Sequence, residues 1–512
     1  MNKQTGINFI AQVITFSINF CISFFLTPFI IEHVGVEANG FVTLANNFVD
    51  YAQLFTVALN SMAGRFITIK IHQKEYADAN KYFTSVIFAN LFLSVVFCVV
   101  FSVVILYLDR FLNISAHAVT DIKILWTFIG LNFVVTLLGS SFSVAAFITD
   151  RLDRTALANA CGIILKAVIL VVCYKFFRPY TFYVGIATLA WGLFNTLCHI
   201  HNKRILVPQL QVRREFYDFS YIKELLTAGI WNSVAKLSTI LSSGLDLLIT
   251  NLFVSGVAMG VLNLSKTFSN VVMSLFAMIA YIFAPQITIA YAQNNFEDIK
   301  QRLISAVKLL ALFSSIPIAI LMGYGRAFYE LWVPMQDSQL LYTLTTISCA
   351  TLVFALPLEV LYHIFTACNK IKATSISLIA FSAANLLTIF IGIRFMPTDT
   401  AKIIFITSAG AFYNVARLLT FLPMYGAKCL DFKLTTFYPI IGLNVLSTCL
   451  LSALAIAANT LLSLDSWITF IVMCAATALV GLLVNFFVLF NRSERANLKT
   501  QAIAIVQQKL RK

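Results

Sequence analysis

The sequence predicts an all-α polytopic membrane protein. Of its 512 residues, 60% are hydrophobic and only 11% are charged, whereas a soluble domain is about a quarter charged and under half apolar. The mean hydropathy is +0.87. About 14 stretches of roughly 20 or more mostly apolar residues follow one another, and each could form a helix that crosses about 30 Å of hydrocarbon. This composition excludes a water-soluble enzyme, a disordered chain and a secreted disulfide scaffold.

The predicted helices are longer than barrel strands, which would be about ten residues and would alternate between polar and apolar side chains. We place them at 6–31, 39–69, 82–108, 124–149, 156–177, 180–200, 226–253, 261–291, 303–324, 339–368, 373–395, 402–424, 434–459 and 466–491.

The basic residues predict the orientation of these helices. With the N-terminus in the cytoplasm, cytoplasmic segments hold 25 of the 36 Lys and Arg residues, outer segments hold seven, and four lie inside predicted helices. Because cytoplasmic loops of membrane proteins carry the excess of basic residues, both termini are expected in the cytoplasm. The net charge of +14 therefore predicts contact with anionic lipid at the inner surface and no nucleic-acid partner.

Sequence motifs for several catalytic classes are missing. The chain has no GxxxxGK[ST] phosphate loop, no HExxH and no GxSxG. Every predicted outer loop is shorter than about 20 residues, which leaves no room for a catalytic domain outside the membrane. The ten cysteines form no CxxC pair, so neither a zinc site nor a disulfide framework is expected. We therefore expect a transporter without catalytic residues, metal or cofactor.

An internal repeat organises the chain. Residues 6–90 align without gaps on 226–310 at a constant offset of 220, which places Gly40 on Gly260, Gln73 on Gln293 and Asp78 on Asp298. Six predicted helices separate the copies, so both run in the same direction and form a parallel repeat. The predicted organisation is an N-lobe (1–200), a basic linker (201–225), a C-lobe (226–424), two additional helices (425–491) and a basic cytoplasmic tail (492–512).

Polar side chains recur on one face of the first two helices of each repeat. Such side chains are costly against lipid, so they face protein or a water-filled cavity. Interhelical hydrogen bonding is the structural alternative for any one stripe. The amides predicted to line a substrate cavity are Asn8, Gln12, Asn19, Asn46, Gln53, Asn232 and Asn270.

Seven ionisable residues lie inside the predicted helices. Four are basic and are candidate ligands for an anion: Lys166, Lys236, Lys266 and Arg417. Three are acidic and are candidates for coupling to H⁺ or Na⁺: Asp50, Asp246 and Glu359. Asp246 and Lys266 are level across a predicted hairpin and could instead form a structural ion pair. Lys236 is about 15 Å from the level of Asp246, which makes it the better ligand candidate.

Several stretches resemble one known family. They are TPFIIEHVGVEANGFVTL, ALNSMAGRFIT, GIWNSVAKLSTILSSGLDLLITNLF, VSGVAMGVLNLSKT, FAPQITIAYAQNNFEDIKQ, ELWVP and IFTACNKIKATSISL. Together they look like the polysaccharide-export (O-antigen-type) flippases of the multidrug/oligosaccharidyl-lipid/polysaccharide exporter superfamily. The tyrosine-glycine that often follows the first outer turn in that family is Asn39 and Gly40 here. The first helix has no basic residue, unlike the peptidoglycan-precursor flippases.

The resemblance implies an alternating-access flippase of the bacterial inner membrane. It would move a polyprenyl-diphosphate-linked oligosaccharide to the outer leaflet, as one of several polysaccharide-assembly membrane proteins, including those for lipopolysaccharide. The alternatives are a cation-coupled multidrug exporter of the same superfamily, a peptidoglycan-precursor flippase, and a membrane enzyme acting on a lipid-linked sugar. The excess of basic over acidic residues inside the helices favours an anionic substrate.

Overall fold

The computed structural model describes residues 3–283, 287, 291, 296–368, 370–461, 464–490 and 495. Within these ranges every regular element is helical, which confirms the predicted class. The chain divides into two compact units, 1–264 (unit 1) and 265–512 (unit 2). The boundaries of the predicted lobes stay a prediction. The predicted basic tail 492–512 lies outside the described residues, apart from Arg495.

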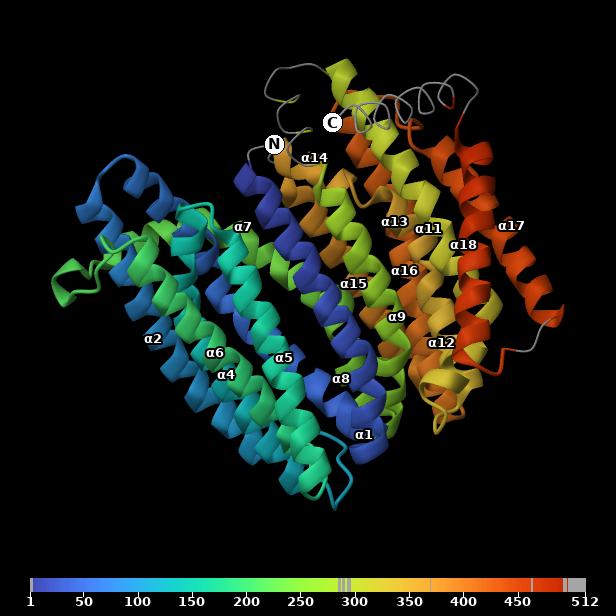
Figure 1. Cartoon of the computed structure of the whole chain (residues 1–512), viewed down its shortest axis with the longest axis horizontal. Coiled ribbons are helices and arrows are strands. Elements are labelled where there is room, and N and C mark those ends of the chain that lie inside the picture. The colour runs from blue at the N-terminus through green and yellow to red at the C-terminus, as the bar shows by residue number, and fades with distance from the viewer. Residues whose placement is uncertain are drawn as a thin grey trace. The chain divides into compact units, whose positions relative to one another are not determined.

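Long helices build unit 1, with α2, α4, α5 and α6 side by side (Figure 1). Its elements are α1 (Lys3–His72), α2 (Tyr76–Leu106), α3 (Leu108–Phe111), α4 (Val119–Ile148), α5 (Leu152–Phe176), α6 (Phe182–Leu206), the 3₁₀ helix η1 (Arg214–Phe216), α7 (Phe219–Thr239), the π-helical turn η2 (Ile240–Gly244), α8 (Asp246–Phe253) and the first part of α9 (Gly256–Tyr281).

Gly35 divides α1 into two helices. The element has 70 residues, or about 105 Å of helix, far more than one membrane crossing requires. At Gly35 the backbone leaves the helical region, with φ 87° and ψ 166°. A positive φ of this size favours glycine, which has no Cβ to clash. The two parts of α1 correspond to the predicted helices 6–31 and 39–69.

Small residues bring α4 and α6 close together. A Cβ on Gly192 would lie 2.0 Å from Asn132 Oδ1, and a Cβ on Gly139 would lie 2.4 Å from Thr196 Oγ1. Helices in membranes associate chiefly through such close packing, because lipid tails are as apolar as the helix surfaces. These two glycines therefore fix the packing within the bundle of unit 1.

The connection from α6 to α7 is fastened to α2. Asn80 Oδ1 accepts the Gln211 N–H at 2.7 Å, and Thr84 Oγ1 donates to the Gln211 carbonyl at 3.2 Å. The carboxylate of Asp218 caps α7 by accepting the Ser220 N–H at 2.9 Å and its hydroxyl at 2.7 Å, which lowers the pKa of that carboxyl. The segment predicted as a linker is thus a fixed part of unit 1.

In the described part of unit 2, α9 continues and nine further helical elements follow it. They are α11 (Phe296–Trp332), α12 (Ser338–Ala350), α13 (Leu352–Leu358), α14 (Leu361–Ala367), α15 (Ile371–Gly392), the 3₁₀ helix η3 (Ile393–Phe395), α16 (Asp399–Lys428), α17 (Tyr438–Leu461) and α18 (Trp467–Leu489).

Two buried asparagines join the last two helices to the rest of unit 2. Asn444 on α17 donates to the Val353 carbonyl at 2.8 Å and accepts from Ser314 at 2.8 Å. Asn485 on α18 donates to the Leu312 carbonyl at 2.6 Å and to Ser315 Oγ at 2.7 Å. A buried amide is costly unless its polar atoms are bonded. The predicted additional helices are therefore an integral part of this unit.

The predicted helix 339–368 is interrupted twice. The axes of α12 and α13 meet at 41° around Thr351, and a second break at Glu359 and Val360 separates α13 from α14. Pro357 lies inside α13, two residues before the second break. The 41° bend at Thr351 therefore has no proline at its centre.

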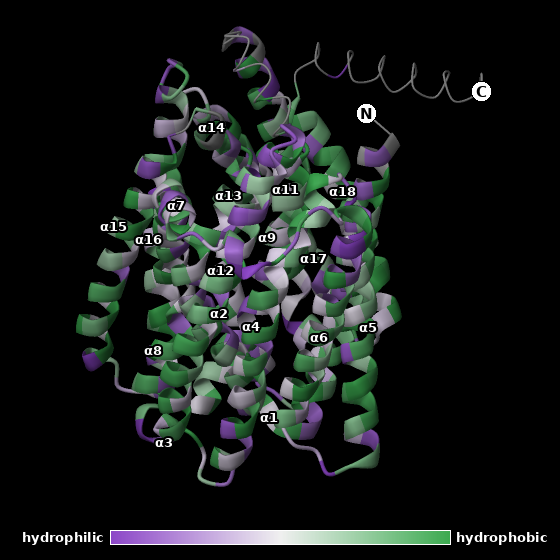
Figure 2. Cartoon of the chain, turned by 90° about the vertical axis from the view of Figure 1, so that its left-hand side faces the viewer, coloured by the Kyte–Doolittle hydropathy of each residue, from purple (hydrophilic) through white to green (hydrophobic). Residues whose placement is uncertain are grey.

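The described helices match the predicted number of crossings. Eleven are long and apolar enough to span a membrane, and two bent pairs raise the number to 13. Because Gly35 splits the first of these in two, the total agrees with the predicted 14. Hydrophobic residues cover most of the helix surfaces, and hydrophilic residues gather toward helix ends and loops (Figure 2). The chain is a polytopic membrane protein.

Candidate functional site: an accessible polar face of unit 1

The second part of α1 and helix α7 are held in close contact. A Cβ on Gly229 would lie only 1.9 Å from the Ala58 carbonyl oxygen, so the backbones touch at this point. Ser233 Oγ donates to the Leu54 carbonyl at 2.8 Å. Glycine and serine at successive turns of α7 thus allow the two helices to approach, as small residues do in membrane bundles.

An ion pair between Lys236 and Asp50 lies further along the same two helices. Lys236 Nζ is 2.9 Å from Asp50 Oδ1. Asp50 is 15 residues after Gly35, about 22 Å along the helix axis, and hence inside a span of about 30 Å. The sequence analysis nominated both residues but gave them separate roles, one as an anion ligand and the other as a coupling acid. The structure brings them together.

This ion pair is accessible. The Lys236 side chain is 25% exposed and the Asp50 side chain 47% exposed. Charged groups inside the membrane are costly against hydrocarbon and face protein or a water-filled cavity. We therefore identify the surface that carries Asp50 and Lys236 as the candidate functional site, and call it the polar face of unit 1.

Two residues beside the ion pair donate hydrogen bonds to the π-helical turn η2, which follows α7. Tyr51 donates to the Gly244 carbonyl at 2.5 Å, and the Asn47 amide donates to the same oxygen at 3.4 Å. A π-helical turn interrupts the regular backbone hydrogen bonds and is frequent at functional sites. Sequence reasoning missed both residues, although their spacing of four places them on one side of α1 next to Asp50.

Several predicted amides lie on or near the polar face. Asn232 on α7 donates to Ser61 Oγ at 2.8 Å, and Asn46 is exposed while its amide donates to the Val42 carbonyl of its own helix at 2.8 Å. Gln53 on α1 is half-buried. These three residues flank the ion pair along the two helices, and their contact with a substrate stays a prediction.

The stripe predicted on the first part of α1 divides into two groups. Asn8 is buried, and its amide donates to the Asp150 carbonyl at 3.0 Å while its oxygen accepts the Asp153 N–H at 3.0 Å. These bonds make Asn8 a structural residue that ties α1 to the start of α5. Gln12 and Asn19 are exposed, which keeps them as candidates for contact with a polar ligand.

Equivalent glycines of the repeat touch each other. A Cβ on Gly40 of α1 would lie 2.8 Å from the Cα of Gly260 on α9, and these two positions are related by the offset of 220. The two glycines therefore let the backbones of α1 and the first part of α9 approach closely within unit 1. The parallel repeat itself stays a prediction.

Lys166 is the second candidate cation of unit 1. It is half-buried in the middle of α5, and the described residues offer it neither a hydrogen bond nor an ion pair. Its chain neighbour Ala167 lines an apolar hollow of about 350 Å³ between α5 and the first part of α1, together with Phe25 and Phe29. Lys166 remains a candidate anion ligand.

The ionisable candidates of unit 2 differ in burial. Lys266 on α9 is half-buried and Asn270 is exposed. Arg417 is buried, only 6% exposed, and its guanidinium donates to the Tyr362 hydroxyl at 2.8 Å. Glu359 is half-buried at the break between α13 and α14. The structure thus holds Arg417, a predicted anion ligand, inside the unit and bonded to Tyr362.

Asp246 begins α8, directly after the π-helical turn, and is half-buried. It belongs to unit 1 and Lys266 to unit 2, so their predicted ion pair stays a prediction. Within the described residues no group of three or more His, Cys, Asp and Glu side chains could hold a metal ion.

Comparison with known proteins extends this picture. No protein-family profile matches the chain. It is 27% identical over 491 residues, 96% of each chain, to a Bacillus subtilis (strain 168) protein described as "Uncharacterized membrane protein EpsK". The structure of the present chain is similar to that of an inward-facing multidrug resistance MATE family transporter of the MOP superfamily. The TM-score is 0.63 at 14% identity, and the match covers 82% of this chain and 98% of that one.

A second solved structure covers more of the chain. It is the lipid II flippase MurJ in an inward closed conformation, with TM-score 0.62, 14% identity, and 94% of this chain and 97% of that one covered. Helices α17 and α18 have 24 and 23 residues. Together they are longer than the 6% of the chain that this structure leaves unmatched, so at least part of them is matched. The chain has the fold shared by the MATE transporters and MurJ.

Proposed function

We propose that this protein is an alternating-access flippase that moves a polyprenyl-diphosphate-linked oligosaccharide from the inner to the outer leaflet for surface polysaccharide assembly. The accessible ion pair of Asp50 and Lys236 is the observation that carries this proposal. Both groups lie within the membrane span and are partly exposed, as expected of a site for a polar, charged cargo.

The chemistry of the site suits a lipid diphosphate with attached sugars. When a diphosphate approaches, the Lys236 ammonium can leave the Asp50 carboxylate and bind the diphosphate, which carries more negative charge. The ammonium has three N–H donors for its oxygens. Asn46, Asn232 and Gln53 supply both donors and acceptors, which sugar hydroxyls require. The apolar hollow beside Ala167 offers contact for part of an isoprenoid tail.

The fold is shared with a multidrug transporter and with a lipid II flippase, which cover 82% and 94% of this chain. The likeness of fold is compatible with either kind of cargo, and the accessible ammonium of Lys236 favours an anionic one. We further propose that the protein lies in the bacterial inner membrane with both termini in the cytoplasm. Coupling to H⁺ or Na⁺ through Asp50, Asp246 or Glu359 is part of the same proposal.

The test is an analysis of lipid-linked oligosaccharides in a deletion strain, resolved by leaflet. We expect loss of the surface glycan and accumulation of the lipid-linked oligosaccharide in the inner leaflet. Unchanged glycan together with hypersensitivity to cationic drugs would contradict the proposal and favour a multidrug exporter. Loss of the lipid-linked oligosaccharide from both leaflets would instead indicate an enzyme of its synthesis.

A further inference from the structure

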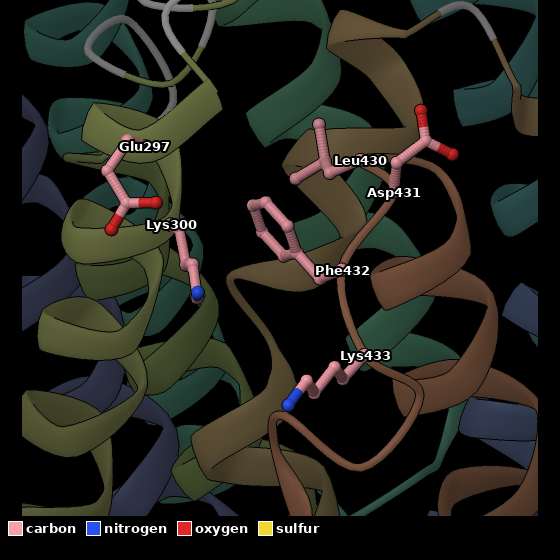
Figure 3. Close-up of a pocket in the computed structure, with 6 residues that line it drawn as sticks. All are labelled: Glu297, Lys300, Leu430, Asp431, Phe432 and Lys433. Atoms are coloured by element: carbon pink, nitrogen blue, oxygen red, sulfur yellow. The ribbon is translucent and has the colours of Figure 1, made fainter.

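A second polar hollow lies in unit 2, where the start of α11 faces the loop between α16 and α17 (Figure 3). It measures about 340 Å³ and is lined by Glu297, Lys300, Leu430, Asp431, Phe432 and Lys433. The candidate spans of these three helices begin or end nearby, at Ile299, Lys428 and Tyr438. The hollow is therefore at the boundary between the membrane and water.

Two lysines reach this hollow from different elements. Lys300 comes from α11 and Lys433 from the loop, and the Asp431 carboxylate points away from both amines (Figure 3). Lys300 Nζ lies 5.8 Å from the centre of the Phe432 ring. In the described part of the chain neither lysine forms an ion pair. Glu297 also lines the hollow, from the same helix as Lys300. The hollow thus holds two ammonium groups and an aromatic face beside two carboxylates, neither of which forms an ion pair with either lysine in the described part of the chain.

The equivalent place in unit 1 is closed. The repeat offset of 220 relates Lys300 on α11 to Asn80 on α2, and each of these residues faces a later inter-helix loop of its own unit. In unit 1 the Asn80 oxygen accepts the Gln211 N–H at 2.7 Å and seals the loop onto the helix. An ammonium has three donors and no acceptor, so Lys300 cannot make this bond, and the hollow stays open.

We propose that this hollow binds a phosphate group, with Lys300 and Lys433 donating to its oxygens and Phe432 packing against the adjoining apolar part of the ligand. Paired ammonium groups form strong, charge-assisted hydrogen bonds to phosphate. The position at the membrane boundary favours the headgroup of an anionic lipid as the source, and a soluble phosphate compound presents the same chemistry. This proposal does not depend on the proposed transport function.

The test uses the full-length protein purified in a neutral detergent. Its melting temperature is measured during titration with short-chain phosphatidylglycerol and, separately, with inorganic pyrophosphate. The variant is Lys300→Asn with Lys433→Gln, in which position 300 takes the residue that unit 1 carries at position 80. The control is Lys428→Gln, which removes the same charge from an exposed lysine at the end of α16 outside the hollow.

We expect the ligand to raise the melting temperature of the wild type and of the control, and the apparent affinity to fall by roughly ten- to thirty-fold in the double variant. Stabilisation by phosphatidylglycerol alone assigns the site to a lipid headgroup, and stabilisation by pyrophosphate as well assigns it to phosphate from either source. Equal stabilisation of the double variant, or no stabilisation of the wild type by either compound, would overturn the proposal. If the double variant melts early without ligand, Lys433→Gln alone gives the same comparison.

Discussion

In unit 1, a lysine and an aspartate inside the membrane pair with each other on an accessible face, at 2.9 Å between Lys236 Nζ and Asp50 Oδ1. In unit 2, Arg417 is buried, and Glu359 lies at a helix break. Of the described residues, none bonds the buried Glu359 Oε2 or the Arg417 Nε atom. The Asp50–Lys236 pair of unit 1 is thus accessible, whereas Arg417 and the Glu359 Oε2 atom of unit 2 are enclosed.

This difference separates two uses of charge. An accessible pair can exchange its internal partner for a ligand, because water and ligand reach it at little cost. Buried charges are costly unless fully paired, so they bind ligands poorly but respond strongly to protonation or to a change in helix packing. We therefore propose that the polar face of unit 1 contacts the cargo, and that the buried charges of unit 2 respond to protonation or to helix packing. Asp50 and Asp246 of unit 1 stay candidates for coupling beside Glu359.

The largest expected effect is on transport. Lys236→Ala removes the accessible cation and leaves Asp50 to repel a diphosphate, so we expect export to fall at least about 100-fold. The protein level should be unchanged, because an exposed ion pair contributes at most about 1 kcal/mol to stability. Surface glycan and protein level are measured in the same cells.

Asp50→Asn is the matched control for this variant, because it keeps the cation and removes its partner. Retained export in Asp50→Asn would show that Asp50 only positions Lys236. Loss of export in both variants would support a coupling role for Asp50. Normal glycan display in Lys236→Ala would remove Lys236 from the site.

The next effect concerns the packing that creates the polar face. Gly229→Ala places a Cβ 1.9 Å from the Ala58 carbonyl oxygen, so α7 must move away from α1, at a cost of about 1–3 kcal/mol. The melting temperature of the purified protein should fall. Gly442→Ala in α17 is the control, since nothing lies within 4 Å of the added Cβ, and it should be neutral or stabilising. Equal melting of the two variants would contradict the close contact.

In unit 2 we expect that the loss of a buried charge does not lower the melting temperature. Glu359→Gln replaces a carboxylate with an amide that is less costly to bury, so the melting temperature should stay the same or rise, by up to about 2 kcal/mol in stability. A fall of similar size would show that Glu359 makes an ionic contact that the protein requires. Retained stability with lost export would support the proposed coupling role.

The smallest effect is expected at the π-helical turn. Tyr51→Phe removes the hydrogen bond to the Gly244 carbonyl and should cost about 1 kcal/mol. The Asn47 amide still donates to this oxygen, which limits the loss. A much larger change in melting temperature would indicate that Tyr51 holds more than this turn.

The sequence predicts the helices well, because long apolar runs leave few other ways to satisfy the backbone in a membrane. It also identifies Asp50 and Lys236 as unusual, since charges in such helices are rare. It does not reveal that they pair, because they are 186 residues apart and their contact depends on how closely Gly229 lets α7 approach α1. The burial of Arg417 is hidden for the same reason, since its partner Tyr362 lies on another helix.

The most direct test of the central assignment is flipping by the purified protein in proteoliposomes. A fluorescent polyprenyl-diphosphate oligosaccharide is placed in one leaflet, and its arrival in the other is followed by accessibility to a quencher. We predict transfer by the wild type and by Gly442→Ala, and none by Lys236→Ala. Transfer by Lys236→Ala at the wild-type rate would contradict the assignment of cargo contact to the polar face of unit 1.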